Sequence, residues 1–283
     1  MPNVRGFTIV ELFAVLAILG LLLALALPAV QQARESARRV DCEHRLREIG
    51  LALHTYESSH RVFPPGATLG GWSFRTMILP ELGLGSVYSL IDFENNLQQP
   101  EGFYTCTREG LRLNTAAPNW DHLGRQLHCP SDPFTSPVLT NYIGVAGSWP
   151  TPFQGAFYPG DRLPPDVDGM LYFCSRVRTA DVTDGASDTL FVGERGTGHS
   201  SGSANTLCGS STGAWDAWLT SAGGLGPGHY QNLDDAFHFW SYHQGGAQFL
   251  FVDGHVQLLN YGIDRRVYFS LSTRAGGEAV GEF

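Results

Sequence analysis

Lysine is absent from this chain of 283 residues, so all 18 basic side chains are arginines. Charged residues are also scarce, at 16% of the sequence, and the formal net charge is −9 at pH 7. Binding to nucleic-acid phosphates depends on a basic surface, which this composition does not supply. The composition therefore argues against a nucleic-acid partner, and the 34 glycines favour a loop-rich, β-containing domain over a helical bundle.

The cysteines include no C-x-x-C pair, which argues against a zinc ribbon or a thioredoxin-like site. The five cysteines are Cys42, Cys106, Cys129, Cys174 and Cys208. In an oxidising compartment, pairs such as Cys106–Cys129 and Cys174–Cys208 are compatible with the sequence, which leaves the connectivity open. No cysteine lies in a recognisable protease context, and we predict that the chain is not an enzyme.

What the sequence does contain is one long apolar segment, residues 7–30, in which Glu11 is the single ionisable residue. Its 24 residues are enough for a helix that crosses a bilayer. A carboxylate inside a membrane is costly, so Glu11 is expected to have a function. Cleavage between Gly6 and Phe7 would give it a partner, because the new α-amino group of Phe7 would lie about one helical turn away, in the same subunit or in a neighbour.

The helical pattern continues beyond this apolar segment. From residue 31 to residue 59, apolar side chains recur at steps of three and four residues, as in an amphipathic helix. Pro28 is expected to bend the helix where the two halves meet, and Phe63-Pro64-Pro65-Gly66 is expected to end it. We therefore predict one helix of about 75–80 Å. A membrane anchor followed by a separate packing helix is the alternative.

The residues at the start of the apolar segment resemble a type IV prepilin leader. Gly6 ends the leader, Phe7 is the first residue of the mature chain and Glu11 is the fifth. The resemblance implies that a prepilin peptidase cleaves after Gly6 and N-methylates Phe7, and that Glu11 sets the register of assembly with other pilin-like subunits. The alternatives are a secretory signal peptide cut after Ala26 and an uncleaved signal anchor, which leaves Glu11 without a role.

Beyond residue 60 the patterns change from long helix to short elements. Two short helical pieces are expected at residues 72–79 and 85–93, and strands at 142–146, 169–177, 188–194 and 237–242. Residues 249–259 are the clearest hairpin, with a type I′ turn at Asp253-Gly254. Strands that follow a helical region indicate an α+β fold. We predict a pilin-like fold in which a long, partly transmembrane spine helix packs on a C-terminal antiparallel β-sheet domain with long loops.

Several further segments point to one family. His243 is followed by nine residues and then Asp253-Gly254. The other segments are residues 33–56, Phe63-Pro64-Pro65-Gly66, Cys129-Pro130-Ser131-Asp132 and residues 181–190. Together they resemble a large bacterial family of uncharacterised pilin-like proteins with a C-terminal H-x9-D-G signature. The chain departs from the family at residues 43–48, where the family has an asparagine-rich, lysine-bearing stretch. The resemblance implies an architecture more than an activity.

One loop has the residue types of a hard-cation site. Asp181, Asp184 and Asp188 surround a turn glycine, and closely spaced carboxylates suit Ca²⁺, as in related pseudopilins. Aspartates also favour turns for local hydrogen-bonding reasons, and that interpretation is preferred here. We predict no required cofactor, with Ca²⁺ at this loop as the one metal considered.

A second group of metal-ligand types lies near the C-terminal end. It consists of His238, His243, Asp253 and His255. If residues 247–252 form one strand, His243 and Asp253 lie near its opposite ends, roughly 20 Å apart at about 3.3 Å per residue. We therefore expect a structural His–Asp contact there in preference to a metal site.

Aromatic residues support an alternative function. Trp215, Trp218, Tyr230 and Trp240 have the residue types of a ligand platform, for instance for sugars, although core packing explains them equally well. On that alternative, the chain is an envelope-anchored module that binds a ligand, possibly a glycan, and the helix only tethers it.

The predicted organisation has three parts: a leader at 1–6, the spine helix at 7–60 and an outward-facing α+β domain at 61–283. The predicted function is that of a pilin-like or pseudopilin-like subunit that assembles into a type IV pilus or a type II secretion-like filament. The expected partners are the prepilin peptidase, other pilin-like subunits and the membrane. The predicted location is the inner (cytoplasmic) membrane, with a single pass and the domain on the periplasmic or exterior side.

Overall fold

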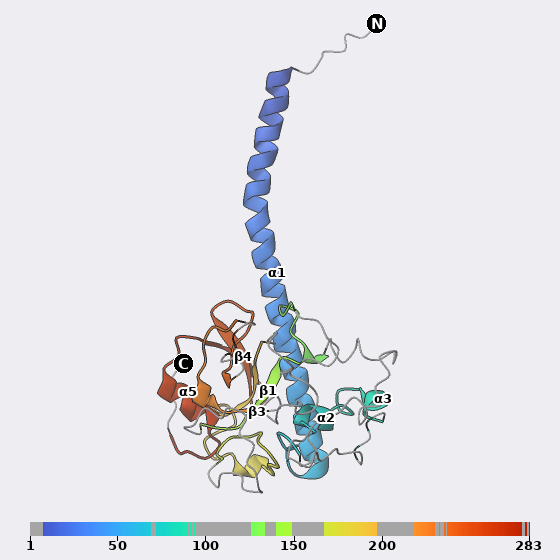
Figure 1. Cartoon of the computed structure of the whole chain (residues 1–283), viewed down its shortest axis with the longest axis vertical. Coiled ribbons are helices and arrows are strands. Elements are labelled where there is room, and N and C mark those ends of the chain that lie inside the picture. Colours follow the sequence, from blue (N-terminus) through green and yellow to red (C-terminus); the bar gives the residue numbers. More distant parts are fainter. Residues whose placement is uncertain are drawn as a thin grey trace.

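The computed structural model describes residues 8–68, 72–89, 91, 93, 126–133, 140–148, 167–196, 218–229, 232, 235, 237–278, 281 and 283. These residues form an α+β fold, with one long helix followed by a five-stranded sheet. Figure 1 shows the long helix as a rod whose N-terminal half projects away from the rest of the chain, while its C-terminal half lies within the globular part. The predicted fold class is confirmed.

The rod is α1, Ile9–His60, a single α-helix of 52 residues. Thr8 caps its N-terminus through a capping box with Glu11, and Arg61 ends it in a left-handed conformation with φ 64°. The helix continues through Pro28 without a break. At about 1.5 Å per residue it is about 78 Å long. The prediction of one continuous helix is therefore confirmed, and a separate packing helix is excluded.

The two halves of α1 have different surroundings. Every residue from Ile9 to Arg34 is exposed, whereas the buried residues of the helix begin at Cys42 and continue to Leu53. Helical spacing puts the buried positions on one stripe that faces the sheet. The domain thus holds only the C-terminal half of the helix.

The sheet consists of β1 (Tyr142–Val145), β2 (Leu190–Glu194), β3 (Trp218–Leu219), β4 (Gly246–Phe251) and β5 (Val256–Asn260), in the order β3-β1-β2-β4-β5. Three of its four strand pairs are antiparallel, as predicted, but β3 runs parallel to β1. The sheet is therefore mixed. The reason is topological. After β2 the chain starts β3 on the other side of β1, and β3 runs opposite to β2; because β1 also runs opposite to β2, β3 and β1 are parallel.

The sheet lies between two apolar cores. Alternate side chains of β4 point to opposite faces: Leu250 packs with Leu46, Ile49 and Leu53 of α1, whereas Phe249 packs against α5 (Arg265–Ser272). The order of layers is thus α1, sheet, α5. The remaining helical elements are short: α2 (Phe74–Met77), α3 (Gly85–Tyr88) and the 3₁₀ turns η1 (Thr179–Asp181) and η3 (Ser221–Gly223).

Three local predictions differ from the structure. Residues 169–177 form no strand; their amides bond to Val145 and Ala67, which leaves one isolated bridge at Phe173. Residues 237–242 likewise contribute only isolated bridges, at 239 and 240. The β4–β5 hairpin lies where it was predicted, but only Gly254 of its turn has positive φ, at 93°. A type I′ turn needs two such residues, so that turn type was wrong.

Candidate functional site

The exposed half of α1 is the first candidate region. Among the described residues, α1 is the one helix long and apolar enough to cross a membrane. The apolar side chains of its N-terminal half, from Ile9 to Val30, are exposed; Ile9, for example, is 73% exposed. Such a surface indicates a membrane or protein contact. The helix also begins with an acidic cap, because Glu11 Oε2 accepts hydrogen bonds of 2.8 Å from both the backbone N–H and the hydroxyl of Thr8. Gly6 and Phe7 lie outside the described residues.

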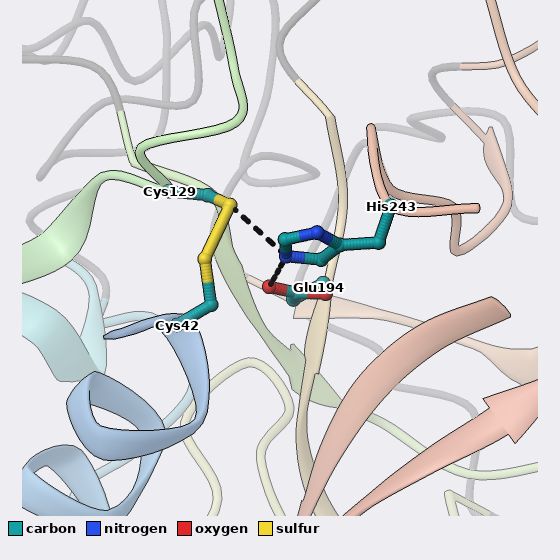
Figure 2. A group of neighbouring side chains, drawn as sticks. All are labelled: Cys42, Cys129, Glu194 and His243. Atoms are coloured by element: carbon teal, nitrogen blue, oxygen red, sulfur yellow. Dashed lines mark hydrogen bonds and ion pairs between the residues drawn. A yellow bond between two sulfur atoms is a disulfide. The ribbon is translucent and has the colours of Figure 1, made fainter. Parts of the chain in front are cut away.

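The second candidate region lies where α1 enters the domain. Cys42, Cys129, Glu194 and His243 are all buried, and one ligand atom from each lies within 4.8 Å of the others. Figure 2 shows the imidazole of His243 between the sulfur of Cys129 and the carboxylate of Glu194, with the disulfide beside it. We call these four residues the Cys–His–Glu cluster. They come from α1, the loop at 128–133, β2 and the turn before β4, so the fold joins them across almost the whole domain.

The disulfide of the cluster joins Cys42 to Cys129, with Cα atoms 5.6 Å apart. This corrects the pairing of Cys129 with Cys106 considered above. The physical reason is that Cys42 lies on the buried stripe of α1, facing the loop that carries Cys129. The Asn141 side chain fixes that loop, since its Oδ1 accepts from the Cys129 N–H at 2.6 Å and its Nδ2 donates to Asp132 at 2.6 Å.

His243 is the centre of the cluster, and its side chain is fully buried. Nδ1 lies 2.6 Å from Glu35 Oε1, and Nε2 lies 3.4 Å from Cys129 Sγ and 3.6 Å from Glu194 Oε1. Burial disfavours the charged imidazolium, but the nearby carboxylates of Glu194, at 3.6 Å, and of the closer Glu35 outweigh burial and raise the pKa of His243 above 6.5. In the disulfide form the ring thus lies beside two carboxylates that favour its charged state.

The two carboxylates are held differently. Glu194 is 1% exposed; its Oε2 accepts from the Gln248 N–H at 2.9 Å, while Oε1 has no hydrogen-bond donor among the described residues. Glu35 is partly exposed and accepts from Arg38 at 2.6 Å and from the Ser131 hydroxyl at 3.1 Å. Burial opposes its charge, but hydrogen bonds from His243 and Arg38 outweigh burial and lower the pKa of Glu35 below 4.5.

The H-x9-D-G residues are not brought together. His243 precedes β4 and belongs to the cluster, whereas Asp253 and Gly254 follow β4 in the hairpin turn, as the strand geometry predicted. The expected His–Asp contact is local: His255 Nδ1 lies 2.6 Å from Asp253 Oδ1. His238 lies 3.8 Å from Asp235.

The three aspartates considered for Ca²⁺ each serve a different local purpose. Asp181 accepts from the Arg178 N–H, and Asp188 accepts from the Ser187 hydroxyl. Asp184 accepts from the N–H groups of Gly276 and Gly277 and so attaches the C-terminal segment. Among the described residues, the one set of metal-ligand side chains with converging ligand atoms is the Cys–His–Glu cluster, which includes none of these aspartates.

Of the remaining predicted aromatic and cysteine positions, the structure describes only some. Trp240 is buried, and its indole N–H donates to the Asp235 carbonyl at 2.9 Å, so it is a core residue and not part of a surface platform. Trp215, Tyr230, Cys106 and Cys208 lie outside the described residues. Cys174 is partly exposed and has a φ of 53°.

Sequence reasoning missed Glu35, Glu194 and the role of Cys42. Glu194 gave the clearest signal, because it ends a strand whose other residues are apolar or glycine, and a carboxylate there has to be satisfied after burial. Glu35 gave no such signal, since acidic residues are common on the polar face of an amphipathic helix.

The model of a family described as "protein of unknown function (DUF1559)" matches residues 31–266, most of the chain. This range contains all four residues of the cluster and begins just after the apolar half of α1. No curated protein matches, and no solved structure matches.

Proposed function

The chain belongs to this DUF1559 family, and on that premise we propose that it is a pilin-like structural subunit that assembles through α1. Gly6 is the cleavage residue, Phe7 the N-methylated first residue of the mature chain, and Glu11 the residue that sets register. The partners are a prepilin peptidase and other pilin-like subunits, either copies of the same chain or different chains. The subunit sits in the inner membrane with its domain outside the cytoplasm, and its role is assembly rather than turnover of a substrate.

The observation that carries the proposal is the division of α1 into two halves. A helix that served only in the core would be buried along its whole length. A helix that served only as an anchor would end near the membrane. Here one unbroken helix has a bare apolar half and a half that is built into the domain. Burying apolar surface contributes about 25 cal/mol per Å², so the bare half favours lipid before assembly and neighbouring helices after it.

The environment of Glu11 supports its proposed assembly role. In the precursor, its carboxylate is satisfied by Thr8, which reduces the cost of a charge in the apolar segment. Cleavage after Gly6 leaves Thr8 as the second residue and places a new amine next to this cap. The amine of a neighbouring subunit then competes for the carboxylate. An ion pair of this kind contributes little net stability, but it penalises every register that leaves one charge unpaired.

Mass spectrometry of the mature N-terminus tests the processing step. We expect a chain that begins at methylated Phe7. A chain that begins at Leu27 would mean signal-peptidase cleavage, and an intact residue 1 would mean an uncleaved anchor; either result contradicts the proposal.

The assembly step is tested with a matched pair of variants, Glu11→Ala and Glu11→Gln. Glu11→Gln keeps an acceptor for Thr8 but removes the charge, so it separates helix capping from register. We expect both variants to enter the membrane and to be cleaved, and both to lose filaments in sheared-cell fractions and electron micrographs. Normal filaments from Glu11→Gln would contradict the register role.

A further inference from the structure

The Cys–His–Glu cluster offers the ligand set of a metal site whenever its disulfide is open. We propose that, in the dithiol form of the chain, the cluster binds one Zn²⁺ ion through Cys42 Sγ, Cys129 Sγ, His243 Nε2 and Glu194 Oε1. Binding of the ion and formation of the disulfide exclude each other. The site is independent of filament assembly and of the processing of the N-terminus.

The distances in the disulfide form already approach those of a tetrahedral site. With Zn–S near 2.3 Å and Zn–N and Zn–O near 2.0–2.1 Å, a tetrahedron requires about 3.5 Å between S and N and about 3.3 Å between N and O. The corresponding distances are 3.4 Å from Cys129 Sγ to His243 Nε2 and 3.6 Å from that nitrogen to Glu194 Oε1. The other three distances between ligand atoms are within 4.8 Å, and the two sulfurs have to separate from bonded contact to about 3.8 Å.

The groups behind the ligands are also those of a metal site. Zinc-bound histidines donate their second ring N–H to a carboxylate or carbonyl, which fixes the ring and its tautomer. Glu35 Oε1 occupies that position, 2.6 Å from His243 Nδ1, and is itself held by Arg38 and Ser131. The second oxygen of Glu194 is likewise fixed, by the backbone N–H of Gln248. Both ligands are therefore oriented before an ion arrives.

Glu194 Oε1 supplies a separate reason for an ion. It is buried, it lies 3.6 Å from His243 Nε2, and none of the described residues donates a hydrogen bond to it. A buried carboxylate oxygen without a donor costs free energy. A cation at the centre of the cluster would satisfy it and would bind the two cysteine sulfurs as thiolates.

The donor set selects the kind of cation. Two thiolates and an imidazole suit Zn²⁺ and other thiophilic ions, whereas Ca²⁺ and Mg²⁺ need six or more oxygens or water ligands. Four protein ligands fill a tetrahedron and leave no open position, which is the arrangement of a structural zinc site. The four ligands together were not predictable from the sequence, because no two of them are near neighbours in the chain.

The exchange between the two forms is a thiol–disulfide reaction. The chain is synthesised with thiols, so the dithiol form comes first. Binding of Zn²⁺ deprotonates the two thiols and releases their protons to solvent. In oxidation of this form by a protein disulfide, the two Zn–S bonds break and the S–S bond forms; two electrons pass to the oxidant, which takes two protons from solvent and leaves as a dithiol. Since a disulfide no longer offers thiolate ligands, the ion is released in the same process. A dithiol reductant reverses the reaction and is oxidised to its disulfide.

The full chain in detergent micelles, reduced with a phosphine and titrated with Co²⁺ as a spectroscopic probe, tests the proposal. We expect one equivalent of Co²⁺ to produce the visible bands of tetrahedral cobalt and the near-ultraviolet thiolate charge-transfer band, and Zn²⁺ to abolish them. The disulfide form should show neither. Absence of these bands in the reduced chain, or equal binding by the two forms, would overturn the proposal; this comparison needs no substitution and so does not depend on how variants fold.

Matched variants then assign the ligands. Cys129→Ser and His243→Ala should each lose the tetrahedral cobalt spectrum, whereas the control substitutions Cys174→Ser and His255→Ala, which change a cysteine and a histidine outside the cluster, should retain it. Glu35→Gln should keep the spectrum but weaken affinity by about 10–100-fold, as for other residues that orient a metal ligand. Unchanged affinity and spectrum in His243→Ala would overturn the assignment.

Discussion

The Nδ1 atom of His243 lies 2.6 Å from Oε1 of Glu35, although the two residues are 208 positions apart in the chain. This contact joins the turn before β4 to α1 just where the helix leaves the domain. On its other side, His243 faces Glu194 of β2 and Cys129 of the 128–133 loop. One imidazole therefore connects the segments that hold the helix in place.

We predict that the Glu35–His243 pair makes the stability of the disulfide form depend on pH. The pKa of His243 is raised above 6.5, so its contribution is complete below pH 6.5 and is lost as pH rises through the raised pKa. The pKa of Glu35 is lowered below 4.5, so its contribution is complete above pH 4.5 and is lost as pH falls through the lowered pKa. The pair should contribute on the order of 1 kcal/mol between these limits.

Thermal melts of the oxidised, metal-free chain at a series of pH values check this prediction. The charged groups that face the pair are Glu194 on β2 and Arg38 on α1. We expect Glu35→Gln to lower the melting temperature most near pH 5–6 and to flatten the fall toward pH 8. Parallel curves for the variant and the wild type would show that the pair does not set the pH dependence.

Tyr142 should tolerate the loss of its hydroxyl. The hydroxyl is fully buried without a hydrogen-bond partner among the described residues, and burial raises the pKa of Tyr142 well above 10. We expect Tyr142→Phe to leave the free energy of unfolding unchanged or to raise it by up to about 1 kcal/mol. The control is Tyr261→Phe, which removes hydrogen bonds to Ser241 and should cost about 1 kcal/mol in the same denaturant titration. A larger loss in Tyr142→Phe than in the control would contradict this account.

Gly66 should not accept even a methyl group. A Cβ atom at Gly66 would lie 2.6 Å from backbone atoms of Leu171 and Tyr172, which cannot move aside as a flexible side chain can. We expect Gly66→Ala to destabilise the domain by about 2–3 kcal/mol in a denaturant titration. Gly85→Ala is the matched control, because its Cβ would meet nothing within 4 Å. Equal stability of the two variants would be inconsistent with the close approach at Gly66.

Asp184 should fasten the C-terminal segment rather than bind Ca²⁺. Its carboxylate accepts from the N–H groups of Gly276 and Gly277 at 2.6 and 2.8 Å and from the Thr273 hydroxyl at 3.1 Å. We expect Asp184→Ala to abolish amide-exchange protection at residues 276–277 and to cost about 1–3 kcal/mol. Asp188→Ala should do neither, since among the described residues the Asp188 side chain accepts a hydrogen bond only from its neighbour Ser187. A Ca²⁺-dependent rise in melting temperature that Asp184→Ala removes would favour the metal instead.

The parts of the fold that were predictable are those set by neighbours in the sequence. The periodicity of residues 9–60 and the alternation around Asp253-Gly254 are local signals, and both α1 and the β4–β5 hairpin lie where they were expected. The direction of β3 was not predictable, because it depends on where a distant strand ends. The strand expected at 169–177 failed for a similar reason: its amides bond to Val145 at the end of β1 and to Ala67, which are distant in the sequence.

The cluster was harder to foresee than the fold. His243 was identified as part of the H-x9-D-G signature and as a metal-ligand residue type, and strand geometry kept it apart from Asp253, but none of its actual partners was predicted. Its actual partner on α1 is 208 positions away, and the Cys42–Cys129 bond spans 87 positions. Contacts at such separations follow from the packing of α1 on the sheet, and neither charge patterning nor cysteine spacing encodes them.

The continuity of α1 has a mechanical consequence. A filament or a membrane that pulls on residues 9–30 pulls along the axis of the same helix whose buried half lies beside the sheet. Apolar contacts along that half resist sliding weakly and one after another, whereas the Cys42–Cys129 bond ties the helix covalently to the domain near the point where the load enters. The chemical state of those two sulfurs therefore sets the force at which the helix can be drawn out of its domain.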